Sequence, residues 1–200
     1  MTGVQAIERI YPTQSMQMRR VERTEFEYIR HGTISLIANW DVAQGQVITP
    51  SIGPQRTEID FATHVKKTIA NDPQGDWIFI VDQLNTHKSE SLVRLVASHG
   101  QLDIDLGVKG KEGVLKSMKT RAEFLSDLTH QIRFVYLPKH TSWLNQIECW
   151  FSILTGSLIR RGNFTSTDDL KHQILEFITY FNRTLAQPFV WKFEGFSASE

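Results

Sequence analysis

The chain has 200 residues, of which 40% are hydrophobic and 22% charged, and these values exclude disorder along the whole length. Its 22 Lys and Arg residues balance 22 Asp and Glu residues, so binding to nucleic acid through a global positive field is excluded and only local patches remain. We expect a single domain over residues 1–200. Because the sequence contains neither a membrane-spanning run nor a signal peptide, we expect a cytoplasmic protein with no membrane partner.

The first third of the chain predicts an arm and then a strand meander. Residues 1–24 are polar and of mixed charge, and we expect an extended arm there. Apolar and polar residues alternate over 26–40, which predicts strands. The turn sequence DVAQG at 41–45 then leads into a pairing strand, QVITPSI at 46–52.

Helices and apolar runs alternate in the rest of the chain. WIFIV at 77–81 and RFVYL at 133–137 are continuous apolar runs, typical of strands buried on both faces. Amphipathic spacing predicts helices at 59–70 after a Thr57 cap, after a Ser89 cap, at 143–160, and from a Thr167 cap to 182. Residues 100–130 are basic and punctuated by glycine, which indicates an insertion. This order predicts an α/β fold, a mixed sheet covered on both faces with its chemistry at the carboxyl ends of the strands.

Polar residues follow both apolar runs. Asp82 directly follows WIFIV, with Asn85 and His87 just beyond it. From its position alone, Asp82 could equally be a capping or turn residue or a functional acid. After RFVYL, Asn145 and Glu148 lie three positions apart on one face of the predicted helix. Taken alone, Glu148 is best explained as a solvated helix residue. Its apolar neighbours nevertheless predict a largely buried stretch, with Cys149 as a small core residue, and a carboxylate there needs a cation, donors or a metal.

Other common catalytic motifs are missing from the sequence. The seven histidines show no zinc-ligand spacing, and no glycine-rich phosphate loop or nucleophile elbow occurs. The remaining candidates are carboxylate oxygens, which suit Mg²⁺ or Mn²⁺ bound together with substrate phosphates.

VDQLNTHKS at 81–89 and YLPKHTSWLNQIECWFS at 136–152 resemble the catalytic core of bacterial insertion-sequence transposases, which are DDE enzymes of the Tc/mariner superfamily. The resemblance covers nearly the whole chain. It implies that Asp82 is the second catalytic acid and Glu148 the third, both as ligands of a two-metal Mg²⁺ or Mn²⁺ site. Asn85, His87 and Asn145 would support them, and Gln146 stands where many relatives have Pro.

The resemblance also implies an RNase H-like fold, a five-stranded mixed sheet flanked by helices. Relatives carry their first acid in an Asp-Glu pair directly before a segment like Met1–Gln5, so we expect the first, central strand and its acid to be missing. A helix-turn-helix domain, usual in such transposases, is also not expected here. Asp41 could replace the first acid, but its place at the start of DVAQG favours a turn residue.

The segment at 106–121 carries five basic residues against one acid, and we expect a mobile, peripheral loop. Its basic side chains either contact DNA phosphates or are simply solvated, and the sequence favours neither alternative. The candidate DNA-contacting residues are Lys109, Lys111, Lys116, Lys119, Lys139 and His140.

The implied function is metal-dependent cleavage and strand transfer of insertion-sequence ends into target DNA, by a homodimer associated with the nucleoid. The alternative is a catalytically incomplete remnant that retains only DNA-binding or dimerisation surfaces, and a third reading is a host nuclease of the same fold. For the catalytic reading we expect WIFIV and RFVYL to be neighbouring parallel strands, with Asp82 and Glu148 within reach of a shared metal.

Overall fold

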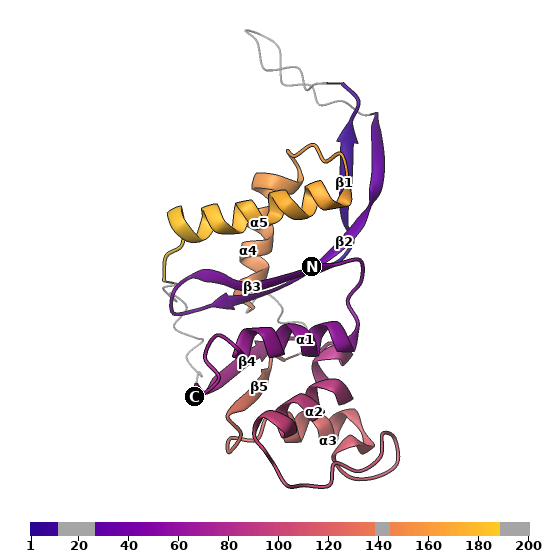
Figure 1. Ribbon diagram of the computed structural model, residues 1–200, viewed down its shortest axis with the longest axis vertical. Coiled ribbons are helices and arrows are strands. Elements are labelled where there is room, and N and C mark those ends of the chain that lie inside the picture. Colours follow the sequence, from indigo (N-terminus) through magenta and orange to yellow (C-terminus); the bar gives the residue numbers. More distant parts are fainter. Residues whose placement is uncertain (12–26, 139–144, 189–200) are drawn as a thin grey trace, which may run out of the picture.

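The structure is a computed structural model that describes residues 1–11, 27–138 and 145–188. Figure 1 shows an elongated molecule with an upper part (β1, β2, β3, α4 and α5) and a lower part (α1, α2, α3, β4 and β5). Met1 lies in the middle of the molecule, where the two parts meet (Figure 1). No helix in the described ranges is long and apolar enough to cross a membrane.

The upper part contains a three-stranded antiparallel sheet in the order β1-β2-β3. Its strands are β1 (Val4–Arg9), β2 (Tyr28–Asp41) and β3 (Gln46–Gly53). The strand β1 corrects the extended arm for the described part of residues 1–24, and positions 12–24 lie outside the described residues. Its alternate residues Val4 and Ala6 point into the core and pair with β2, a contact that the local sequence does not reveal.

Three helical segments complete the upper part: α4 (Gln146–Leu154), the π-helical turn η4 (Thr155–Ile159) and α5 (Thr167–Thr184). Ser166 caps α5, one residue before the cap expected from the sequence. The ring of Trp150 meets that of Phe181 edge-on, with 6.2 Å between centroids, and both belong to the core beneath β1 and β2. The predicted helix at 143–160 begins in residues outside the described ranges, and its described part is helical through η4.

The lower part contains two parallel strands, β4 (Trp77–Val81) and β5 (Ile132–Tyr136), so the pairing expected for WIFIV and RFVYL is confirmed. The helices α1 (Glu58–Ile69) and α2 (Glu90–His99) pack on one face of this pair. They begin at the predicted caps, Thr57 and Ser89, whose hydroxyl oxygens accept from backbone N–H groups in the first turn.

Residues 108–113 of the segment at 106–121 are exposed at the surface, as expected, but the segment is not a single loop. It contains a short turn, η2 (Val114–Lys116), and leads into α3 (Met118–Leu125), capped by Ser117. The side chain of Leu115 is fully buried and that of Arg121 is only 8% exposed. The insertion inferred for residues 100–130 therefore contributes to the lower core, because its few apolar residues gather on one side.

The structure also corrects the prediction that both apolar runs are buried on both faces. On β4 the side chains of Ile78 and Ile80 are 52% and 50% exposed, and on β5 Val135 is 48% exposed. The expected mixed sheet is accordingly divided into one three-stranded and one two-stranded sheet. In the part of the chain that the structure describes, no strand pairs with β4 on its other edge.

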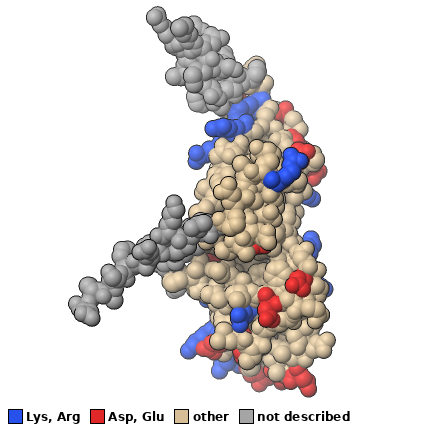
Figure 2. Space-filling model, turned by 90° about the vertical axis from the view of Figure 1, so that its left-hand side faces the viewer, with Lys and Arg blue, Asp and Glu red and all other residues tan. Residues whose placement is uncertain are grey.

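A groove of about 450 Å³ separates the two sheets. Its walls are residues 38–43 at the end of β2, residues 77–80 of β4 and residues 145–147 at the start of α4. Figure 2 shows that mostly uncharged residues form the middle of one face of the molecule. The pairing of β1 with β2 stops at Ile34, so the end of β2 has one free edge that faces this groove. The edge of β4 that pairs with no described strand faces it as well.

Candidate active site between the two sheets

Asp82 follows directly after β4, at the carboxyl end of the parallel pair. Its Oδ1 accepts a hydrogen bond from the backbone N–H of Leu84 at 3.0 Å. The same oxygen lies 2.8 Å from Nδ1 of His87, and the carboxylate stays partly exposed. Asp82 is thus both a turn-forming residue and an oriented, accessible carboxylate, the two readings that its position left open.

His87 lies on the 3₁₀ turn η1 (Asn85–Lys88) that follows Asp82. Its ring packs against that of Phe61 of α1, with 4.4 Å between ring centroids and a tilt of 40° between the planes. Burial lowers the pKa of His87, while the Asp82 carboxylate acts in the opposite direction. The neutral imidazole therefore acts as a fixed hydrogen-bond partner of Asp82. Asn85, at the start of the same turn, is exposed to solvent.

Long-range hydrogen bonds that the sequence analysis missed hold this turn. The hydroxyl of Tyr136 on β5 donates to the carbonyl of His87 at 2.8 Å. Nε of Arg121 donates to the carbonyl of Lys88 at 2.6 Å, and Nη1 donates to the carbonyl of Leu115 at 3.0 Å. No local signal in the sequence could have shown these contacts, since their partners lie 6 to 49 positions apart.

Glu148 lies in the first turn of α4, and Asn145 occupies the cap position before it. Asn145 caps through its backbone, because its carbonyl accepts from the N–H of Glu148 at 2.9 Å while its side chain makes no capping bond. Glu148 and Cys149 are exposed, which corrects the buried environment expected for both. The buried side of this helix is instead formed by the next two residues, Trp150 and Phe151.

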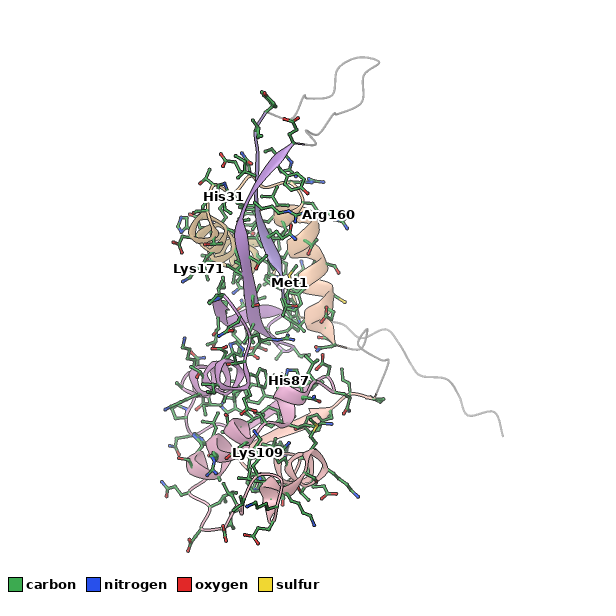
Figure 3. All side chains as sticks on the ribbon, turned by 90° about the vertical axis from the view of Figure 1, so that its right-hand side faces the viewer. Met1, His31, His87, Lys109, Arg160 and Lys171 are labelled. Atoms are coloured by element: carbon green, nitrogen blue, oxygen red, sulfur yellow. The ribbon has the colours of Figure 1, made fainter. Side chains whose placement is uncertain are left out.

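Asp82 and Glu148 both lie near the amino group of Met1. Burial lowers the pKa of this amine to about 6, Arg56 acts in the same direction, and the carboxylates of Glu148 and Asp82 oppose it. Met1 and Glu148 also line one pocket of about 370 Å³, together with Arg160. Figure 3 shows Met1 between Arg160 above and His87 below. The two candidate acids thus approach one region from separate elements, and their reach to a shared metal stays a prediction.

The described residues contain no group of three or more His, Cys, Asp or Glu side chains that could hold a metal ion. Asp41 does not join the other two acids in such a group. Its Oδ1 accepts from the backbone N–H groups of Ala43 and Gln44 at 2.9 and 3.0 Å, and Gly45 has a φ of +67°. The turn interpretation of Asp41 is therefore confirmed.

The predicted DNA-contacting lysines lie in the lower part of the molecule. Lys109 is below His87 in Figure 3, 3.5 Å from a carboxylate oxygen of Glu58 and 3.6 Å from one of Glu90. Lys119 pairs with Glu123 one helical turn further on, at 3.9 Å. Lys111 and Lys116 are exposed. The remaining two candidates, Lys139 and His140, lie outside the described residues.

A mixed α/β fold with an aspartate at the end of a parallel strand, and a glutamate reaching the same region from a later helix, is of the nuclease-like class. The family model of the DDE superfamily endonuclease matches residues 3–171, and the chain belongs to this family. It is therefore a transposase-type domain, of a class that acts on DNA and generally uses divalent metal ions. No match was found among curated proteins or among solved structures.

Proposed function

We propose that this chain is the catalytic part of a bacterial insertion-sequence transposase of the Tc/mariner group, with an RNase H-like fold. It would cleave DNA strands at the element ends and transfer them to a target, as a homodimer on the nucleoid. The main support is the family match over residues 3–171, within which Asp82 follows β4 and Glu148 lies in the first turn of α4, 66 positions later in the sequence (148 − 82).

In this proposal Asp82 and Glu148 would hold Mg²⁺ or Mn²⁺, since exposed carboxylate oxygens are the ligands these ions prefer. When bound, the metal pair activates the attacking water or 3′-hydroxyl and stabilises the leaving oxygen. His87 orients the carboxylate of Asp82, and Asn145 begins the helix that carries Glu148. The donors fit in kind but not in number, because two acids leave a two-metal site short of ligands.

A further strand in the groove between the sheets would supply the missing first acid. Met1 donates to the carbonyl of Leu36 at 2.9 Å, and the N–H of Leu36 donates back to the Met1 carbonyl at 2.9 Å. A polypeptide joined to Met1 would continue this ladder past Ala38 and Trp40, which line the groove. It would also cover Ile78 and Ile80 of β4, so we propose that the groove holds an apolar central strand ending in an acid.

The second candidate is a catalytically incomplete remnant that retains DNA-binding or dimerisation surfaces. One observation favours it: the described residues contain no cluster of three acidic or other ligating side chains. A remnant of this kind would bind DNA without cutting it.

A cleavage assay separates the two candidates. The 200-residue chain is compared with a version extended upstream through an apolar strand and an Asp-Glu pair, with and without Mn²⁺. We expect metal-dependent cleavage of terminal-repeat DNA by the extended chain only, and its loss in Asp82→Asn and Glu148→Gln variants. Cleavage that survives both substitutions would reject the proposed site. Absence of cleavage in both versions, with DNA binding retained, would favour the remnant.

A further inference from the structure

Three arginines gather in the upper part of the molecule, and the proposed chemistry does not use them. Arg9 is the last residue of β1, and Arg160 and Arg161 directly follow η4. The guanidinium of Arg9 donates from Nη1 to the carbonyl of Gly162 at 2.5 Å and from Nη2 to the carbonyl of Arg160 at 2.9 Å. These bonds fix three positive residues beside one another, and we call them the arginine cluster.

The arginine cluster has no acidic partner among the described residues. None of its guanidinium groups lies within ion-pair distance of a carboxylate in the described ranges, whereas Lys109 is near two carboxylates. Arg160 and Arg161 are exposed, and their side chains make no hydrogen bond to a described residue. Like charges held together repel one another, so this arrangement favours an external anion.

The arginine cluster is continuous with the candidate active site. Arg160 lines the pocket of about 370 Å³ that also contains Glu148 and Met1. In Figure 3, Arg160 lies above Met1, on the side away from His87 and Lys109. An anion bound at the arginines would therefore extend from Glu148 toward the upper end of the molecule.

We infer that the arginine cluster binds the phosphate backbone of duplex DNA as it runs toward Glu148, an inference that rests on the proposed function. A guanidinium presents a planar fork of donors that matches the oxygens of a phosphate. Such contacts fix the position of a duplex without reading its sequence. The DNA then runs over the upper part of the molecule, and contact of the lysines at 106–121 with DNA stays a separate prediction.

Salt dependence of binding tests this inference. A fluorescent synthetic duplex is titrated with each protein at several NaCl concentrations, in EDTA so that neither metal nor cleavage contributes. Each phosphate contact adds about 0.9 to the slope of log affinity against log salt. We expect Arg160→Gln/Arg161→Gln to lower the slope by about 2, and the matched control Lys66→Gln/Lys67→Gln, at two exposed lysines in the last turn of α1, to leave it unchanged.

One further variant keeps the outcome clear. Arg160→Lys/Arg161→Lys retains both charges and should keep the slope, which separates loss of charge from loss of fold. Arg9 is left intact because it bonds to the backbone of its neighbours. An unchanged slope in the glutamine double variant, or an equal decrease in the lysine control, overturns the inference.

The result is independent of the cleavage assay. Arginine-dependent DNA binding by an extended chain that never cleaves would reject the proposed enzyme and leave this inference standing. Cleavage by a chain whose slope does not depend on Arg160 and Arg161 would reject this inference alone.

Discussion

The imidazole of His87 joins Asp82 to the helical layer of the lower part. Its Nδ1 lies 2.8 Å from the Asp82 carboxylate, while its ring packs against Phe61 of α1. The orientation of the carboxylate at the strand end therefore depends on a side chain from a helix packed against the sheet. Because burial lowers the pKa of His87, the ring is neutral at pH 7 and serves as a structural partner.

Replacing His87 by Ala should weaken metal binding at the proposed site. Loss of a partner that orients a ligand typically lowers metal affinity by about 10- to 100-fold. Mn²⁺ binding followed by calorimetry on the extended chain measures the effect, and His87→Asn should restore part of it by donating to Asp82. His172→Ala on α5, where the ring is 70% exposed, is the control. Equal affinities in His87→Ala and His172→Ala would show that His87 has no such role.

Arg121 should hold the turn η1 in place. Arg121 is 8% exposed and donates to the carbonyls of Lys88 and Leu115. Arg121→Gln removes both bonds, and among the described residues only the Leu115 carbonyl keeps another donor, the N–H of Gly110. We expect a loss of about 1–3 kcal/mol in the free energy of unfolding. Amide hydrogen exchange at 85–88 should be faster, as measured by NMR. The exposed Arg94→Gln, which breaks a surface pair with Glu90, should cost less than about 1 kcal/mol. Unaltered exchange in Arg121→Gln would contradict the bracing role.

Local patterns predicted those elements whose own residues determine them. The hydroxyl caps at Thr57 and Ser89 begin α1 and α2, and the apolar runs at 77–81 and 133–137 form the parallel pair. Asp82 also lies at the strand end, as its sequence position indicated. The caps and the strand end at Asp82 depend on neighbours within a few residues, whereas the pairing of the two strands was expected from their alternation with helices.

The features that the sequence did not predict depend on distant partners. β1 looks polar, and only its pairing with β2 explains why Val4 and Ala6 are buried. The exposed face of β4 likewise follows from the absence of a covering element in the described ranges, which an apolar run cannot indicate. In the sequence, Arg121 looks like one more basic residue of a loop, whereas in the structure it is buried and donates to the carbonyls of Lys88 and Leu115.

His64 should make the protein sensitive to acid. It is fully buried on α1, with Nδ1 3.0 Å from the hydroxyl of Ser51, and burial lowers its pKa to about 4. The unfolded chain binds a proton near pH 6.5 while the folded chain does not, so stability is lost as pH falls from about 6.5 toward 4. The shift corresponds to about 3 kcal/mol.

Urea unfolding at several pH values tests this prediction. His64→Gln removes the titrating group, so the free energy of unfolding of this variant should change less between pH 7 and pH 4 than that of the wild type. His172→Gln, an exposed histidine, should behave as the wild type. A wild-type pH dependence in His64→Gln would assign the acid sensitivity to other groups.

The exposed face of β4 should become a buried face when a central strand occupies the groove. In this chain Ile78 and Ile80 are half-exposed, so Ile78→Thr/Ile80→Thr should lower the free energy of unfolding by less than about 2 kcal/mol in total. In the extended chain the strand covers both side chains, and the same variant should lose about 3–5 kcal/mol. Phe134→Ala, at a side chain 1% exposed, should cost about 3–5 kcal/mol in both versions. Urea unfolding of the two chain lengths, each with these variants, gives the comparison. If the isoleucine variant costs the same small amount in both versions, the groove does not hold the strand, and the proposed first acid must reach Asp82 and Glu148 by another route.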